Sequence, residues 1–175
     1  MKVLLVIDVQ NDFVSGSLGS KEAQETLKNI EDLVNEKRSE GYCIIFTKDT
    51  HSESYLETPE GKKLPVPHCI RGTKGWELAI NNLPSEAIFE KMTFGLKTIF
   101  SRIQERVYLL GEEIEGIELC GYCTDICVIS NALILKASTL SIPISVHEIA
   151  CAGTSQISHN EAISIMRKCQ IDIIP

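Results

Sequence analysis

The sequence predicts a single three-layer, Rossmann-like α/β domain over residues 1–175, with a mainly parallel sheet flanked by helices. Three observations predict this fold. Short apolar runs alternate with longer amphipathic stretches, which is the pattern of strand–helix units with right-handed crossovers. A length of 175 residues suits one hydrophobic core. No repeat, low-complexity tract or linker divides the chain.

The N-terminal half begins with a strand that we expect to be buried. Residues 2–8 are a continuous apolar run ending in polar residues, as in a strand covered on both faces. After a loop rich in Gly and Ser, residues 21–40 carry apolar side chains at helical spacing, and Gly41 is a C-terminal stop. A second strand is expected at 42–47. Residues 50–73 contain three prolines and little periodicity, which predicts a long functional loop.

The rest of the chain continues the alternation of strands and helices. The expected elements are a short helix at 76–81, a strand at 87–91, a helix at 96–106, a strand at 116–121, a helix at 125–138, a strand at 143–149, a helix at 158–168 and a strand at 171–174. The helix at 125–138 is apolar around much of its circumference, so we expect it to be largely buried. In open α/β sheets, ligands bind outside the carboxyl ends of the strands.

Composition excludes several classes of function. The net charge of −7 argues against a nucleic-acid partner, because binding phosphates needs a basic face. The apolar runs are far shorter than the ~20 residues of a membrane helix, and no secretory signal is recognisable. Seven cysteines, mostly in apolar stretches, predict free thiols in a reducing cytoplasm. Neither a Rossmann glycine motif nor a Walker motif supports a nucleotide cofactor.

Cys127 is the candidate nucleophile. A strand is expected to run directly into a helix here, with Thr124 as the N-cap and Cys127 in the first turn. The positive end of a helix favours a thiolate, which predicts a lowered pKa for Cys127, and its free N–H groups can receive an oxyanion. A lone cysteine on an apolar helix is more often a core residue. Asp8 and Lys91, a base and a cation at other strand ends, favour the catalytic interpretation.

Asp49, His51 and His68 form a candidate metal site. Residues two apart in an extended chain face the same side, so Asp49 and His51 can bind one ion together, and His68 can contribute from across the loop. Two imidazoles and one carboxylate suit zinc, iron or manganese and leave positions open for water or substrate. Glu60 is a further candidate ligand. A solvated loop with surface histidines is the alternative, and spacing alone does not decide between the two.

Five motifs occur in one order over almost the whole chain. They are Val-Ile-Asp-Val-Gln-Asn-Asp-Phe at 6–13, Asp-Thr-His at 49–51, Pro-His-Cys-Ile-Arg-Gly-Thr-Lys-Gly at 67–75, Glu-Lys-Met-Thr-Phe at 90–94, and Gly-Tyr-Cys-Thr-Asp-Ile-Cys-Val at 121–128. Together they resemble the isochorismatase-like cysteine hydrolases, and most closely the nicotinamidases (pyrazinamidases). The resemblance implies a metal-dependent amidase that hydrolyses nicotinamide to nicotinate and ammonia through a thioester.

The resemblance also implies a role for each catalytic residue. Cys127 is the implied nucleophile, Asp8 its base and later the acid for the leaving ammonia, and Lys91 the charge that stabilises the thiolate. A cis peptide between Cys123 and Thr124 is implied as well. It would turn the N–H of Cys123 toward that of Cys127, so that the two form the oxyanion hole.

The resemblance also implies which residues bind the metal and the substrate ring. Asp49, His51 and His68 would ligate a divalent metal that holds the pyridine nitrogen. Phe13 and Phe94 would sandwich the ring, although Phe94 is nearly as well explained by core packing. The implied partners are a small amide substrate and further copies of the chain in a homo-oligomer. The sequence departs from many nicotinamidases in lacking a bulky residue after the metal-site aspartate and an aromatic before the last histidine, so the shape of the ring pocket is less defined than the hydrolytic trio.

Two alternatives stay open at this stage. One is a cysteine hydrolase of the same fold that acts on another small amide or carbamoyl compound. The other is a non-catalytic metal-binding scaffold, which has no need for Asp8, Lys91 and Cys127 together. His147 and His159 have no partner at ligand spacing, so we expect them to be structural or exposed.

Overall fold

The most apolar segments of the chain form one parallel sheet. The computed structural model describes residues 1–175. The strands are β1 (Lys2–Ile7), β2 (Cys43–Asp49), β3 (Ala87–Lys91), β4 (Gly116–Tyr122), β5 (Ile144–Ala152) and β6 (Asp172–Ile174). They lie in the order β3-β2-β1-β4-β5-β6, and every neighbouring pair is parallel. The α/β class that the sequence predicts is confirmed.

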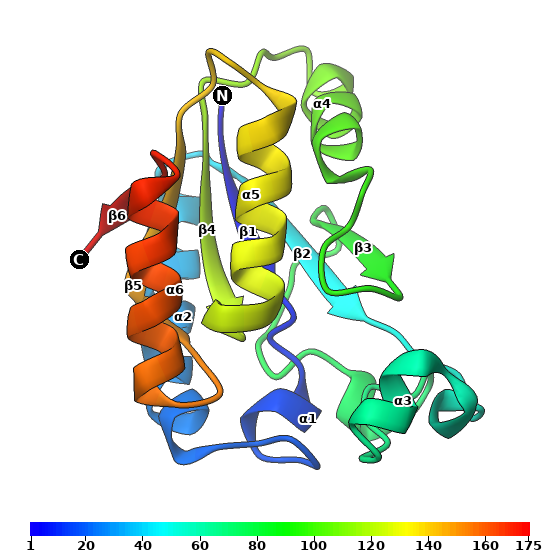
Figure 1. The fold of residues 1–175 in the computed structure, drawn as a ribbon. Coiled ribbons are helices and arrows are strands. Elements are labelled where there is room, and N and C mark those ends of the chain that lie inside the picture. Colours follow the sequence, from blue (N-terminus) through cyan, green and yellow to red (C-terminus); the bar gives the residue numbers. More distant parts are fainter.

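Helices cover both faces of the sheet and make the three layers (Figure 1). One face carries α2 (Lys21–Ser39), and the opposite face carries α4 (Ile99–Leu109), α5 (Ile129–Ser138) and α6 (Gln156–Lys168). The short helices α1 (Asn11–Val14) and α3 (Pro59–Lys63) lie beyond the carboxyl ends of the strands, at the bottom of Figure 1. None of these helices combines the length and the apolar character needed to cross a bilayer.

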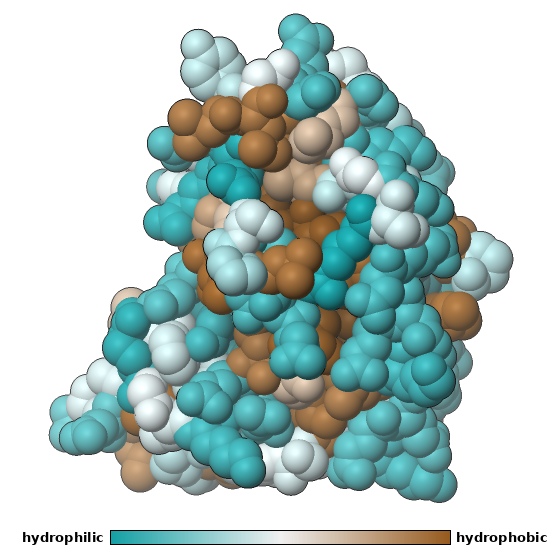
Figure 2. Space-filling view, turned by 180° about the vertical axis from the view of Figure 1, so that it is seen from behind, coloured by the Kyte–Doolittle hydropathy of each residue, from teal (hydrophilic) through white to brown (hydrophobic).

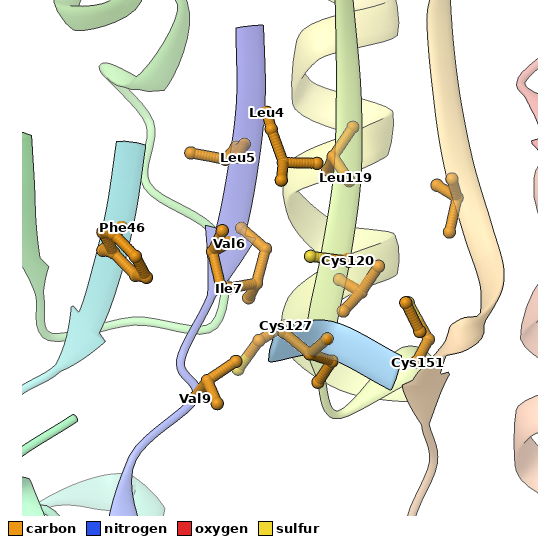
Figure 3. Close-up of a cluster of buried hydrophobic side chains, with 14 of the residues drawn as sticks. Leu4, Leu5, Val6, Ile7, Val9, Phe46, Leu119, Cys120, Cys127 and Cys151 are labelled. Carbon is orange, nitrogen blue, oxygen red and sulfur yellow. The ribbon is translucent and has the colours of Figure 1, made fainter. Parts of the chain in front are cut away.

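The centre of the core is β1, which pairs with β2 on one side and β4 on the other. Residues 4–7 of this strand are completely buried, and each such apolar side chain contributes about 1.5–3 kcal/mol on burial. Figure 3 shows them packed beside Phe46, Leu119 and Cys120, with Cys127 at the lower end of the cluster. On the outer surface, hydrophobic residues gather in the middle of one face between hydrophilic borders (Figure 2).

Gly121 allows β4 to approach β1 closely at the end of the sheet. It pairs with Ile7 and has a φ of 122°, in the region that favours glycine. A Cβ atom at this position would lie 2.1 Å from the carbonyl oxygen of Ile7. A side chain here would therefore push apart the two strands that lead into the polar edge of the sheet.

Two local expectations are wrong. No helix forms at 76–81; instead a 3-10 helix covers Lys74–Trp76, and Leu78 then bridges to Gln10 as an antiparallel extended residue. The loop at 50–73 contains a 3-10 helix at Tyr55–Glu57 and the helix α3. Helices of three to five residues are too short to show a hydrophobic period, so local bonds define them. In α3, for example, the Thr58 side chain accepts a hydrogen bond from the N–H of Gly61 at 3.0 Å.

Candidate active site

Three charged side chains meet where three adjacent strands end. Asp8 follows β1, Asp49 ends β2, and Lys91 ends β3, directly opposite Asp49 in the register. The Nζ atom of Lys91 lies 2.5 Å from Oδ2 of Asp8 and 3.6 Å from Oδ1 of Asp49. Asp8 has a φ of 48°, which is uncommon for a non-glycine residue and turns the chain sharply out of β1. The edge of the sheet thus carries a buried cluster of two carboxylates and one ammonium.

Cys127 reaches the same cluster from the neighbouring strand. A π-helix at Thr124–Val128, labelled η3, follows β4 and continues into α5. Single turns of π-helix are rare and frequently mark functional sites. The Sγ atom of Cys127 lies 3.5 Å from Nζ of Lys91, and its side chain is buried. The structure therefore brings Asp8, Lys91 and Cys127 together, although more than a hundred residues separate the first from the last.

The protonation of this trio is set by its burial. Burial raises the pKa of the Asp8 carboxyl, while the neighbouring Lys91 opposes that shift. Burial lowers the pKa of Lys91, but the charges of Asp8 and Cys127 outweigh this effect and raise it. Burial also raises the pKa of the Cys127 thiol well above its usual range, against the opposing charge of Lys91. The sulfur therefore keeps its proton in the free protein, next to a carboxylate that is able to accept it.

The expected lowering of the pKa of Cys127 is wrong for a physical reason. The cysteine does not lie at the free N-terminus of an α-helix but inside a π-helix of five residues, and it is only 5% exposed. Loss of hydration disfavours the thiolate more strongly than the helix dipole favours it.

The turn before Cys127 also differs from the expectation. The cis peptide bond joins Tyr122 and Cys123, one residue before the expected position, because β4 ends at Tyr122 and the chain turns there. The carbonyl of Cys123 accepts hydrogen bonds from the N–H groups of Ile126 (3.1 Å) and Val128 (3.0 Å), whereas its own N–H donates to no protein acceptor. A free N–H group beside the nucleophile is what an oxyanion hole requires.

Thr124 does not cap the helix as expected. It lies within η3, and no side-chain cap bond is made at the start of that helix. Its Oγ1 atom instead hydrogen-bonds to Nδ1 of His159 on α6, at 2.8 Å. The hydroxyl of Thr124 is therefore engaged with a neighbouring helix and not with the N–H groups of its own turn.

Asp49, His51 and His68 form the second group at this edge. Their ligand atoms all lie within 4.8 Å of one another, and the three side chains are buried. The Nε2 atoms of His51 and His68 lie 2.9 Å and 3.5 Å from Oδ2 of Asp49. Nδ1 of His68 is 2.8 Å from the carbonyl oxygen of Val66, so donation of its proton there leaves Nε2 free as a ligand. The burial of both imidazoles excludes the alternative of a solvated loop with surface histidines.

The donor set of this group fits a divalent metal ion. Two imidazoles and one carboxylate with open positions are typical of transition-metal sites. Oε1 of Glu60 is 3.8 Å from Nε2 of both histidines, although Glu60 is not part of the compact group of three. Glu60 is therefore a candidate fourth ligand beside the three.

Sequence reasoning missed three residues that position the site. Thr47 donates to Oδ1 of Asp8 at 2.6 Å and accepts from the N–H of Asp8 at 3.2 Å. The Gln10 amide bridges the backbone of Asp49, donating to its carbonyl at 2.9 Å and accepting from its N–H at 2.8 Å. The ring of Tyr55 makes T-shaped contacts with both imidazoles, with centroids 4.7 Å and 4.9 Å away. Gln10 lies within the motif at 6–13, which is a signal that could have identified it, whereas Thr47 and Tyr55 lie in none of the five motifs.

The histidines set aside from the site are both buried. Nε2 of His147 lies 2.7 Å from Oε2 of Glu118. His159 contacts Thr124, directly behind the turn that carries Cys127. Both histidines are therefore structural residues, and neither is exposed.

A cavity of ≈ 670 Å³ lies against both groups. Its lining includes Cys127 and Cys123 on one side and Asp49 and His68 on another, with mostly apolar side chains between them. Burial raises the pKa of Cys123 to about 12, so this second thiol stays protonated near neutral pH. An apolar cavity with a few convergent polar groups is the usual form of a small-molecule site.

Both phenylalanines expected to hold a ring line the cavity, but they differ in exposure. Phe13 is buried against the core, with its ring centroid 5.7 Å from that of His68. Phe94 is 48% exposed, which excludes its interpretation as an ordinary core residue.

The comparison with family models decides the relationship of this chain to known proteins. Residues 2–175 match the isochorismatase domain. The chain belongs to the isochorismatase family. This result confirms the family that the five motifs indicate.

Curated relatives of this isochorismatase-family protein span nearly its full length. A Bacillus subtilis protein described as the uncharacterized isochorismatase family protein PncA is 32% identical over 172 residues, which cover 93% of this chain and 92% of that protein. The nicotinamidase/pyrazinamidase of Mycobacterium tuberculosis is 26% identical over 186 residues, covering 99% and 98% of the two chains.

Solved structures of a nicotinamidase/pyrazinamidase and of a pyrazinamidase share the fold of this chain. The nicotinamidase/pyrazinamidase PncA from Bacillus subtilis superposes with a TM-score of 0.85 at 25% identity and covers 99% of both chains. The pyrazinamidase of Pyrococcus horikoshii, solved in complex with zinc, gives a TM-score of 0.83 at 20% identity and covers 99% of this chain and 98% of its own. At 20% identity, the likeness to the Pyrococcus horikoshii protein shows only that the two chains share a fold.

Proposed function

We propose that this protein is a metal-dependent cysteine amidase that hydrolyses nicotinamide to nicotinate and ammonia. One observation carries the proposal: Lys91 lies within 3.5 Å of both Asp8 and Cys127, and Cys127 lines a cavity that is also lined by Asp49 and His68 of the metal group. The relatives named nicotinamidase, which match over nearly the whole chain, support the same activity.

The first half-reaction forms a thioester on Cys127. Asp8 accepts the thiol proton while the sulfur attacks the carboxamide carbon, which converts the carbonyl into an oxyanion. The N–H of Cys123, which is free of backbone acceptors, would donate to that oxyanion together with the N–H of Cys127. The tetrahedral intermediate then expels ammonia, which takes the proton from Asp8. Lys91 keeps its charge throughout and stabilises the negative charge that passes between sulfur and carboxylate.

The second half-reaction releases the acid. A water molecule loses a proton to Asp8 and attacks the thioester carbon, and the carbon–sulfur bond breaks. Asp8 returns the proton to the sulfur, so Cys127 is regenerated as a thiol and nicotinate leaves. The raised pKa of Asp8 suits a group that must hold and release a proton twice in each turnover.

The metal group and the aromatic residues bind the substrate in this proposal. Asp49, His51 and His68 would hold zinc, iron or manganese, and a bound divalent ion supplies Lewis-acid and water-activating chemistry. Phe13 and Phe94 would contact the faces of the pyridine ring. Stacking of this kind contributes about 0.5–1.5 kcal/mol beyond burial.

An ammonia-release assay with nicotinamide tests the proposal directly. The purified protein is assayed after chelation and again with added zinc, iron or manganese. We expect turnover with metal and at least about tenfold less after chelation, as ligand-sphere losses typically produce. Absence of ammonia under every metal condition would contradict the assignment.

The size of the cavity favours one further candidate substrate class. A volume of ≈ 670 Å³ lies within the range of about 300–1,000 Å³ that is typical for drug-sized ligands, so it leaves room beyond a single pyridine ring. A cysteine hydrolase acting on another, larger amide or carbamoyl compound fits this volume. Comparing kcat/KM for nicotinamide, pyrazinamide and larger aryl and alkyl amides separates the two candidates.

A further inference from the structure

The turn that carries Cys127 is held by two side-chain contacts from outside it. Thr124, at its start, is completely buried and shares a 2.8 Å hydrogen bond with Nδ1 of His159 on α6. Asp125, the next residue, accepts hydrogen bonds from Thr154 at 2.9 Å (N–H) and 2.5 Å (hydroxyl). Helix α6 and the segment before it therefore fix the π-helix from behind, on the side away from Lys91.

The packing behind this turn is tight. A Cβ atom on Gly153 would lie 2.9 Å from Oδ1 of Asp125 and 3.0 Å from both Cβ and the backbone nitrogen of His159. Glycine at this position therefore lets α6 approach the turn closely enough for the hydrogen bond to Thr124. Because both partners are buried, losing the bond would leave a buried polar group without its partner, which costs free energy.

The hydrogen bond joins two uncharged groups. Burial lowers the pKa of His159, so its ring is neutral near neutral pH. A neutral imidazole carries one ring proton: with that proton on Nε2 the Thr124 hydroxyl donates to Nδ1, and with it on Nδ1 the ring donates to the hydroxyl oxygen. Thr124 is thereby held between Cys123, whose N–H is free, and Cys127.

We propose that His159 is a positioning residue, which holds Thr124 and so keeps the Cys123 N–H and the Cys127 sulfur aligned for attack. It touches neither substrate nor the reacting atoms. The inference rests on the proposed amide hydrolysis, because alignment is measured through that reaction. The metal group at Asp49 and the ring contacts lie on other segments, so substrate binding should depend little on His159.

A double-mutant cycle tests the proposal. Thr124→Val removes the hydroxyl, His159→Leu removes its imidazole partner, and the double variant removes both. Since small misplacements of reacting groups cost up to about 100-fold in rate, we expect each single variant to lower kcat about 10- to 100-fold with KM within about twofold. The double variant should be no slower than the worse single variant, since both remove one interaction.

Two matched variants distinguish positioning from general damage. His159→Asn places an amide oxygen near the position of Nδ1, so it should recover most of the lost kcat. His147→Leu removes another buried histidine from the same half of the sheet, where it pairs with Glu118 instead of the turn, and should leave kcat unchanged. Effects on kcat that multiply in the double variant, or a His159→Asn variant as slow as His159→Leu, would overturn the proposal.

Amide hydrogen exchange tests the role of His159 without relying on nicotinamide hydrolysis. Wild-type protein that releases no ammonia from nicotinamide contradicts the proposed function, and the amide exchange rates of residues 123–128 then decide the role of His159. In Thr124→Val and His159→Leu, we expect these amides to exchange at least about fivefold faster, with β1 unchanged. Unchanged exchange in the turn would show that the hydrogen bond does not hold it.

Discussion

Nζ of Lys91 lies 2.5 Å from Oδ2 of Asp8, and both side chains are completely removed from solvent. Burying two charges costs several kcal/mol per ion, and their mutual attraction only partly recovers it. A fold that needed only stability would be as well served by apolar residues here. The pair is therefore best explained by the chemistry it provides beside Cys127, with a charge to stabilise the sulfur and a base to take its proton.

Breaking this ion pair should destabilise the fold as well as stop catalysis. Lys91→Met leaves the Asp8 carboxylate buried without its partner, and we expect a loss of about 3–5 kcal/mol in the free energy of unfolding. The double variant with Asp8→Asn should recover much of that stability but no activity. Urea unfolding curves measure both effects. Lys28→Met, which breaks an exposed pair with Asp32, is the control and should cost under about 1 kcal/mol. Equal stability of Lys91→Met and wild type would contradict the buried-charge argument.

Replacing the nucleophile should stop hydrolysis without unfolding the protein. Cys127→Ser and Cys127→Ala should lower kcat for nicotinamide by about a thousandfold or more, because no thioester forms. The thermal unfolding midpoint should change by only a few degrees, since the side chain is small. Cys169→Ser, at an exposed thiol, is the matched control and should retain full activity. Ammonia release near the wild-type rate in Cys127→Ala would remove the proposed mechanism.

Much of the fold and the site is predictable from the sequence because the signals are local. Apolar runs define the strands, and the polar residues at their ends predict that Asp8, Lys91 and the segment 123–127 meet at one edge. What the sequence does not reveal depends on tertiary contacts. Thr47 and Gln10 position the site through side-chain bonds between segments that are far apart in the chain. The raised pKa of Cys127 likewise results from burial, which its position after a strand does not disclose.

Removing one metal ligand should weaken metal binding and activity together. His51→Ala and His68→Ala each delete one of three buried donors, so we expect metal content to fall well below one ion per chain and kcat/KM to fall at least about tenfold. Elemental analysis and the ammonia assay measure the two quantities. Glu60→Gln should have a smaller effect, because Glu60 lies outside the compact group. A His51→Ala variant with full metal content and activity would show that the group is not the metal site.

Glu118 should make the free energy of unfolding depend on pH in the acidic range. Burial alone raises the pKa of this carboxyl, but hydrogen bonds from His147 and Tyr42 outweigh it, so its pKa in the folded state is below the usual value of 4.5. A carboxyl whose pKa is depressed by folding contributes stability that is present above pH 4.5 and is lost as the pH falls through the folded pKa. We therefore expect the free energy of unfolding to decrease below pH 4.5, and to decrease less in Glu118→Gln. Urea unfolding between pH 3 and pH 7 measures the two curves. Glu113→Gln, at an exposed site, is the control and should behave like wild type. A flatter curve for Glu118→Gln alone would assign the effect to this carboxyl. Parallel curves for Glu118→Gln and wild type would show that Glu118 is not responsible.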